Sequence, residues 1–65
     1  MPEPSDVFSA LAKLSERQRA ALVLHCYAGY LLKEVGQILD TAKAAVGVHL
    51  TRGRRRLRAL LEETR

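Results

Sequence analysis

The sequence of 65 residues predicts an all-α fold of four helices, of which the last is the longest. Three observations predict it. Apolar residues recur at three- and four-residue spacing, and no segment keeps the two-residue alternation of a strand. Ala, Leu, Arg and Glu dominate the composition, and all four favour helices. Capping and turn residues divide the chain into four segments, which together form one small domain with a thin margin of stability.

The first helix is predicted to begin at Ser5 and Asp6, whose side chains can cap its amide groups. Residues 1–5 are interpreted as the remnant of a linker, and residues 6–64 as the domain. The apolar stripe of this helix consists of Val7, Phe8, Leu11 and Leu14.

The second helix has a clear start and a clear end. Ser15 and Gln18 have the spacing of a capping box, in which each side chain binds the backbone amide of the other residue. Gly29 is expected to end the helix, because glycine takes the left-handed conformation freely. The apolar residues predicted on this helix are Leu22, Val23, Cys26 and Tyr27.

The third helix is predicted over 32–39, although Leu31 stands where a capping Ser or Thr would be expected. Its inward residues are Val35, Ile38 and Leu39. Residues 40–42 break the pattern, and a break of this length between two helices is typical of a helix-turn-helix. Asp40 or Thr41 can cap the helix that follows.

The last helix is predicted over 43–63, about 32 Å at 1.5 Å per residue. Its inner stripe consists of Val46, Leu50, Gly53, Leu57 and Leu60, and Gly53 is expected to allow close helix packing. Its outer face consists of Ala44, Gly47, Val48, Thr51, Arg55 and Arg58. The core of the whole domain is predicted to include Leu11, Leu22, Val35, Leu39, Val46, Leu50 and Leu57.

Positive charge is concentrated near the C-terminus. Residues 1–40 carry four basic and five acidic side chains, whereas residues 41–65 carry seven basic and two acidic ones. Such an asymmetry favours a polyanionic partner such as nucleic acid over its alternative, a solvated arginine-rich face. Five of the seven basic residues are Arg52, Arg54, Arg55, Arg56 and Arg58.

Other function classes find no support in the sequence. Cys26 is the only cysteine in the sequence, so an internal disulfide is excluded, and a single free thiol suits a reducing cytoplasm. Cys26 is interpreted as a small core residue. His25 and Cys26 are adjacent and therefore diverge on a helix, so no metal site is expected. No apolar run is long enough to span a membrane, and the first residues lack the pattern of a signal peptide. With no nucleophile–base pair, carboxylate dyad or phosphate-binding loop, we expect neither an enzyme nor a cofactor.

The residues that carry a resemblance to a known family are Leu14-Ser15-Glu16-Arg17-Gln18-Arg19, then Ala21-Leu22-Val23-Leu24, then Gly29, then Lys33-Glu34-Val35-Gly36-Gln37-Ile38-Leu39, and finally Leu50-Thr51-Arg52-Gly53-Arg54-Arg55-Arg56-Leu57-Arg58. Over about residues 8–62 the chain resembles region 4 of the bacterial extracytoplasmic-function sigma factors. The resemblance implies that the last helix enters the major groove of promoter DNA at the −35 element, while a separate region 2 reads the −10 element. It also implies that the domain docks on the β-subunit flap of RNA polymerase, with an anti-sigma factor as a further partner.

The chain departs from the family at the start of the recognition helix. Where members usually carry a Thr, a Lys or Arg, a Ser and an Arg, this sequence has Ala45, Gly47, Val48 and His49. These residues cannot make the bidentate contacts that read guanine or adenine, so direct readout is expected to be weak. Val48 can contact a thymine methyl and Thr51 can make one hydrogen bond.

Binding is therefore expected to depend on phosphate contacts and on DNA shape. Lys43, Arg52, Arg54 and Arg55 are the predicted phosphate anchors, and Lys33 is predicted to hold the flanking backbone. Ala44 and Gly47 allow the helix to approach closely. The complete set of predicted DNA-binding residues is Lys33, Lys43, Ala44, Gly47, Val48, Thr51, Arg52, Arg54 and Arg55.

Two alternative functions stay open at this point. A response-regulator output domain of the LuxR type shares the L-S-x-x-Q/E opening but usually lacks the Arg-Arg-Arg-Leu tail. A degenerate helix-turn-helix that mainly binds protein would explain the neutral recognition surface. Tyr27 and Tyr30 are interpreted as packing around a turn. The alternative is that Tyr30, Leu31 and Leu32 form an exposed apolar surface for a protein partner.

Overall fold

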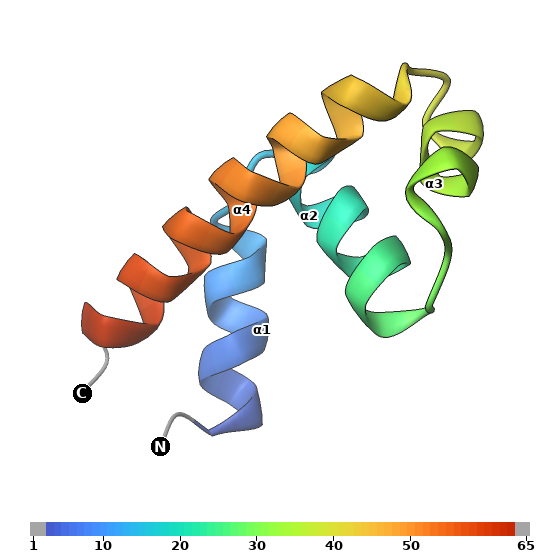
Figure 1. Ribbon diagram of the computed structural model, residues 1–65. Helices are drawn as coiled ribbons and strands as arrows, with labels where there is room; N and C mark the ends of the chain where they lie inside the picture. Colours follow the sequence, from blue (N-terminus) through green and yellow to red (C-terminus); the bar gives the residue numbers. More distant parts are fainter. Residues whose placement is uncertain (1–2, 64–65) are drawn as a thin grey trace.

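The computed structural model describes residues 3–63 and has the predicted all-α architecture, with no strand among those residues. Its helices are α1 (Pro4–Ala12), α2 (Glu16–Leu22), the π-helical turn η1 (Val23–Tyr27), α3 (Leu32–Ile38) and α4 (Lys43–Glu63). In Figure 1, α4 crosses the molecule, with α1 beside its C-terminal half, α3 near its N-terminal end and α2 between them. The long axis of 35 Å is therefore set by α4.

The core lies where α1, α2 and α3 pack against α4. Four of the seven predicted core residues are buried, namely Leu22, Val35, Val46 and Leu50, and the other three, Leu11, Leu39 and Leu57, pack half-buried against them. Gly53 is buried on the inner stripe as predicted. A Cβ there would lie 3.1 Å from Leu22 Cδ1, so the glycine lets α2 approach α4 closely.

Two residues predicted to face inward are exposed instead. Phe8 is 63% exposed and Ile38 is 52% exposed. In each helix a small residue, Ala10 in α1 and Gly36 in α3, is buried on the side that faces the core. Phe8 and Ile38 lie on other sides of these helices. The observed inner lines are Val7, Ala10 and Leu11 in α1, continued by Leu14 just after it, and Leu32, Val35 and Gly36 in α3, continued by Leu39 just after it.

The prediction for the start of α1 is also wrong. The helix begins at Pro4, which suits the first helical position because its missing amide hydrogen is not needed there. Asp6 does not precede the helix but lies in its first turn, where its carboxylate accepts a hydrogen bond of 3.2 Å from the Glu3 amide. The helix thus includes Pro4 and Ser5, which the sequence assigned to a linker. Residues 1 and 2 of the predicted linker and residue 64, the predicted end of the domain, lie outside the described residues.

The predicted limits of the second helical segment are confirmed. Ser15 Oγ accepts from the Gln18 amide at 3.1 Å, and Gln18 Oε1 accepts from the Ser15 amide at 3.3 Å. At the other end, Gly29 has a φ of +80°. Between them, the last turn is π-helical and holds one residue more than an α-turn. The helical spacing is thereby shifted, and Cys26, predicted to be a core residue, is exposed.

The shift at η1 also changes which neighbours of Cys26 face the core. Val23 is 40% exposed and Tyr27 is 78% exposed, whereas Leu24, which the sequence pattern did not single out, packs against the core. The prediction that Tyr27 packs around the turn is therefore wrong.

α3 begins without a capping Ser or Thr, and only the reciprocal half of a capping box forms, because the Leu31 side chain cannot accept a hydrogen bond from the first turn. The Glu34 carboxylate accepts a hydrogen bond of 2.8 Å from the amide of Leu31, the residue before the helix. The helix ends at Ile38, one residue earlier than predicted, which is within the usual uncertainty of helix ends.

The turn between α3 and α4 completes a helix-turn-helix. Asp40 takes the left-handed conformation with a φ of +53°, which aspartate tolerates better than most residues. The Thr41 amide donates to the Gly36 carbonyl at 2.8 Å. Because α4 begins at Lys43, the residue that precedes it is Ala42. The predicted capping position at Asp40 or Thr41 is therefore wrong, since these residues form the turn.

Gly36→Ala is expected to destabilise the fold by about 1–3 kcal/mol, because a Cβ at this position would lie 2.8 Å from the backbone oxygen of Thr41. The matched control is Gly47→Ala, at a helical position where a Cβ would meet no atom within 4 Å. The control should raise stability by up to about 1 kcal/mol. Urea unfolding followed by circular dichroism measures both variants, and a Gly36→Ala midpoint at or above that of the wild type would contradict the close approach.

Candidate nucleic-acid interface

The outer face of α4 carries a shallow depression on the second helix of the helix-turn-helix. Its lining residues are Ala44, Gly47, Val48, Thr51, Arg52 and Arg55. The uninterrupted helix from Lys43 to Glu63 places them together, because residues three and four apart share a face. Six of the nine residues predicted to bind DNA are therefore brought into one surface.

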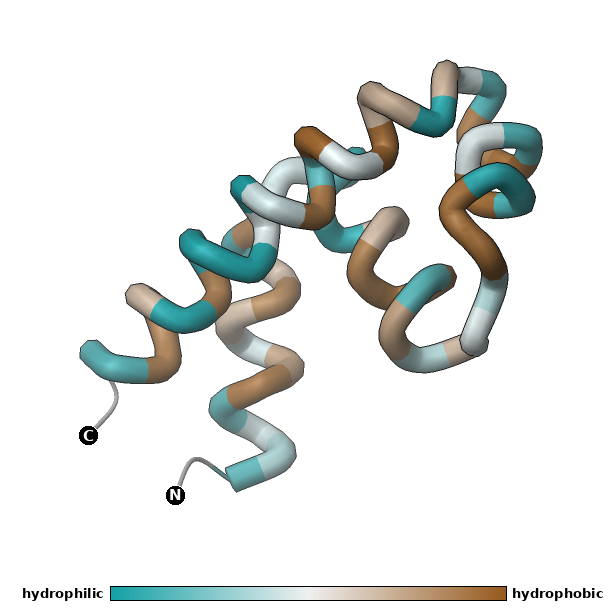
Figure 2. The backbone as a smooth tube through the Cα atoms, viewed as in Figure 1, coloured by the Kyte–Doolittle hydropathy of each residue, from teal (hydrophilic) through white to brown (hydrophobic). Residues whose placement is uncertain are grey.

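The N-terminal part of the depression is small and uncharged. Val48 is 47% exposed, and Gly47 next to it leaves open space where a Cβ would stand. Figure 2 shows apolar and weakly polar residues along the first turns of α4 and hydrophilic ones recurring along its later turns. A base pair can therefore approach the backbone closely at Gly47, beside side chains that carry no charge.

Thr51 has an internal hydrogen bond that limits what it offers. Its hydroxyl donates to the Gly47 carbonyl, one turn earlier in the helix, at 3.0 Å. The hydroxyl hydrogen is therefore used within α4. What remains for a ligand is the side-chain methyl and the acceptor lone pairs of the oxygen.

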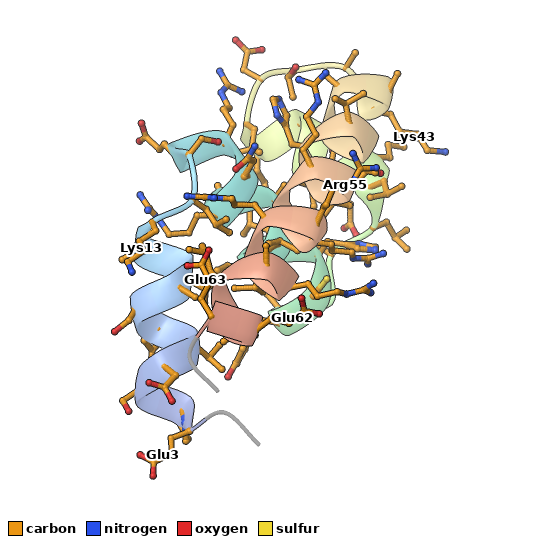
Figure 3. The ribbon with its side chains drawn as sticks, turned by 90° about the vertical axis from the view of Figure 1, so that its left-hand side faces the viewer. Glu3, Lys13, Lys43, Arg55, Glu62 and Glu63 are labelled. Atoms are coloured by element: carbon orange, nitrogen blue, oxygen red, sulfur yellow. The ribbon has the colours of Figure 1, made fainter. Side chains whose placement is uncertain are left out.

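Basic groups surround the C-terminal part of the depression. Arg52 and Arg55 line it, and both are exposed. Lys43, the first residue of α4, is exposed about 18 Å from Arg55 along the helix. In Figure 3 these two lie over the upper part of the molecule, whereas Glu62 and Glu63 lie toward the opposite end of α4. The charges therefore favour a polyanion near the N-terminal two thirds of the helix.

Three predicted site residues, Lys33, Lys43 and Arg54, lie outside the lining of the depression. Lys33 is exposed on α3, the first helix of the helix-turn-helix. Arg54 lies against η1 instead, where its guanidinium donates to Cys26 Sγ at 3.5 Å. Consecutive helical positions diverge by about 100°, which separates Arg54 from Arg55. The structure therefore does not bring Arg54 together with the other predicted phosphate anchors.

Two further basic residues have structural roles that the sequence pattern did not indicate. The Arg19 guanidinium donates to the carbonyls of Leu11, Ala12 and Leu14 at 3.3–3.4 Å, at the C-terminal end of α1. A cation is favourable there because the carbonyls at a helix C-terminus carry partial negative charge. The Arg17 guanidinium donates to the Leu39 carbonyl at 2.9 Å and so ties α2 to the end of α3.

A second surface, the apolar groove, lies between α1, η1 and α4. Its walls are almost wholly apolar, and Phe8 and Pro4 extend it along α1. The sequence could not predict it because it depends on how three elements meet. Of the alternative exposed surface of Tyr30, Leu31 and Leu32, the first two are exposed, by 41% and 66%, whereas Leu32 packs against the core, and none of the three lines this groove. The groove is lined by Val7, Leu11, Leu22, Val23, Cys26, Tyr27, Arg54 and Leu57.

Within residues 3–63, no group of three His, Cys, Asp or Glu side chains could hold a metal ion. The His25 side chain forms a hydrogen bond within the turn, with its Nδ1 2.8 Å from the Tyr30 carbonyl oxygen. In the same part of the chain, no helix has both the length and the hydropathy needed to cross a bilayer.

Comparison with known proteins identifies one family. A family model described as sigma-70, region 4, matches residues 6–57, a range that begins within α1, ends within α4 and contains every residue of the depression. Neither the curated proteins nor the solved structures gave a significant match to this chain.

Proposed function

Because the chain belongs to the sigma-70 region 4 family, we propose that it binds promoter DNA at the −35 element as part of a sigma factor that recruits RNA polymerase for transcription initiation. The observation that carries the proposal is the depression on the outer face of α4, with Arg52 and Arg55 at its basic end. Within the family, the Arg-Arg-Arg-Leu tail favours the extracytoplasmic-function group. The family match supports this function over that of a response-regulator output domain.

In this proposal α4 lies in the major groove and the basic residues bind phosphates on both sides of it. Arg52 and Arg55 bind next to the depression, Lys43 binds at the start of α4, and Lys33 binds the flanking backbone from α3. The acidic residues at the far end of α4 limit the interface, because they repel phosphate. Ala44, Gly47, Val48 and Thr51 face the base edges.

The apolar groove is the surface that we assign to RNA polymerase, at the β-subunit flap. On α4 the groove is lined by Arg54 and Leu57. The depression is lined by other residues of the same helix, on its outer face: Ala44, Gly47, Val48, Thr51, Arg52 and Arg55. Since the two surfaces occupy different sides of the helix, DNA and polymerase can bind at the same time. An anti-sigma factor that covered the apolar groove would exclude polymerase.

One pair of variants separates the two surfaces. Val23→Glu places a charge in the apolar groove and is expected to weaken binding to RNA polymerase core at least tenfold, while binding to a −35 duplex stays within about twofold. Arg55→Ala is expected to show the reverse pattern, because it removes a charged phosphate contact worth about 1.5–3 kcal/mol. Fluorescence anisotropy of a labelled duplex measures the affinity for DNA, and that of the labelled chain measures the affinity for RNA polymerase core.

Both substituted residues are exposed, so circular dichroism should show that each variant keeps the wild-type helix content. Loss of both affinities in either variant would contradict two separate surfaces. If the wild type bound polymerase and no duplex DNA, the domain would be a protein-binding helix-turn-helix and the proposed function would be wrong.

A further inference from the structure

We propose that the chain recognises thymine methyl groups in the major groove through the side chains of Val48 and Thr51. The inference rests on the proposed DNA binding and names the base feature that the outer face of α4 reads. The family match does not supply it, because it follows from what these two residues present at the surface of this chain.

Val48 presents methyl groups to any ligand in the depression. Its side chain is 47% exposed, whereas Val46, two residues earlier on the inner stripe, is fully buried. At Gly47, a Cβ would meet no atom within 4 Å. The missing side chain at Gly47 leaves room for a base pair to reach the methyl groups of Val48.

Thr51 presents a methyl group for a different reason. Because its hydroxyl donates to the Gly47 carbonyl at 3.0 Å, it has no hydrogen left for the acceptor atoms of guanine or of a phosphate. Ala44, also in the lining, adds a third methyl-bearing side chain. The groups that the neutral part of the depression offers to DNA are therefore mainly methyl groups.

In the major groove, the apolar feature of a base edge is the C5 methyl of thymine. Contact between this methyl and the side chains of Val48 and Thr51 removes apolar surface from water on both sides. Burial of one methyl-sized group corresponds to about a fourfold change in affinity. A readout of this size agrees with the weak sequence preference expected for a helix without bidentate hydrogen-bonding residues.

The test compares duplexes that differ only in this methyl. The probes are a duplex of about 20 base pairs with an A·T-rich centre, and the same duplex with deoxyuridine in place of thymidine. The wild-type chain is expected to bind the thymidine duplex about fourfold more tightly or better. For Val48→Ala and for Thr51→Ser, which keeps the hydroxyl and removes the methyl, the ratio of the two affinities should fall toward one.

Arg52→Ala is the matched control. A phosphate contact carries no sequence information, so this variant should bind both duplexes more weakly and keep the wild-type ratio. Val48→Ala also controls for altered DNA shape, because any effect of deoxyuridine on the duplex itself persists in this variant. Circular dichroism checks that each variant is folded.

Each outcome decides the proposal. Equal binding of the two duplexes by the wild-type chain would overturn methyl recognition and leave the proposed DNA binding intact. A wild-type preference that persists unchanged in both Val48→Ala and Thr51→Ser would show that DNA shape, and not these side chains, reads the thymines. If the wild-type chain bound neither duplex, the proposed function itself would be overturned.

Discussion

Raising the monovalent salt concentration from about 50 to about 200 mM is expected to weaken binding of the chain to a −35 duplex by about 150-fold. Each phosphate neutralised on B-DNA contributes about −0.9 to the slope of log K against log salt concentration. Lys33, Lys43, Arg52 and Arg55 are the four side chains that we assign to phosphates, which gives a slope of about −3.6.

The slope of log K against log salt concentration also indicates how many side chains bind phosphate. A slope shallower than about −2 would mean that fewer than three side chains bind phosphate, which would contradict a shared role for α3 and α4. A slope steeper than about −5 would mean that Arg54, Arg56 or Arg58 also binds DNA, and Arg54 would then have to leave Cys26. The helix content should be recorded at each salt concentration, so that a change in folding is not mistaken for a change in binding.

The limits of the second helical segment could be predicted because a local hydrogen bond sets its start and a backbone conformation sets its end. The capping box at Ser15 and Gln18 needs only four neighbouring residues, and Gly29 needs only its own φ. The start of α3 at Leu32 agrees with the predicted range 32–39, although Leu31 cannot cap with its side chain. The amide of Leu31 is satisfied by Glu34 instead.

The inner faces of the short helices were harder to predict. A pattern built on large apolar residues placed Phe8 and Ile38 inside, whereas the close approach of neighbouring elements selects Ala10 and Gly36. The spacing of apolar residues does not mark the π-helical turn, in which Cys26 is exposed.

The candidate interface was easier to predict than the core. α4 is one uninterrupted helix, so a rotation of 100° per residue was sufficient to place Val48, Thr51 and Arg55 on one face. The side-chain hydrogen bond of Thr51 and the position of Arg54 depend on atoms elsewhere in the fold. They could therefore be found only from the structure.

Arg52 and Arg56 test most directly whether the outer face of α4 binds DNA. Both are exposed members of the same charge cluster, but only Arg52 lines the depression. Arg56 lies one turn further along α4, about 6 Å, and about 40° further toward the core. Arg52→Ala and Arg56→Ala remove the same charge, so each serves as the control for the other.

Binding of both variants to one −35 duplex at a single salt concentration is the decisive measurement. Arg52→Ala is expected to weaken binding by about 10- to 150-fold, which corresponds to about 1.5–3 kcal/mol for a lost hydrogen bond to a charged group. Arg56→Ala is expected to weaken it by less than about threefold, as for an exposed charge without a specific contact. If Arg56→Ala weakens binding as much as Arg52→Ala or more, the DNA lies against a different face of α4 from the depression.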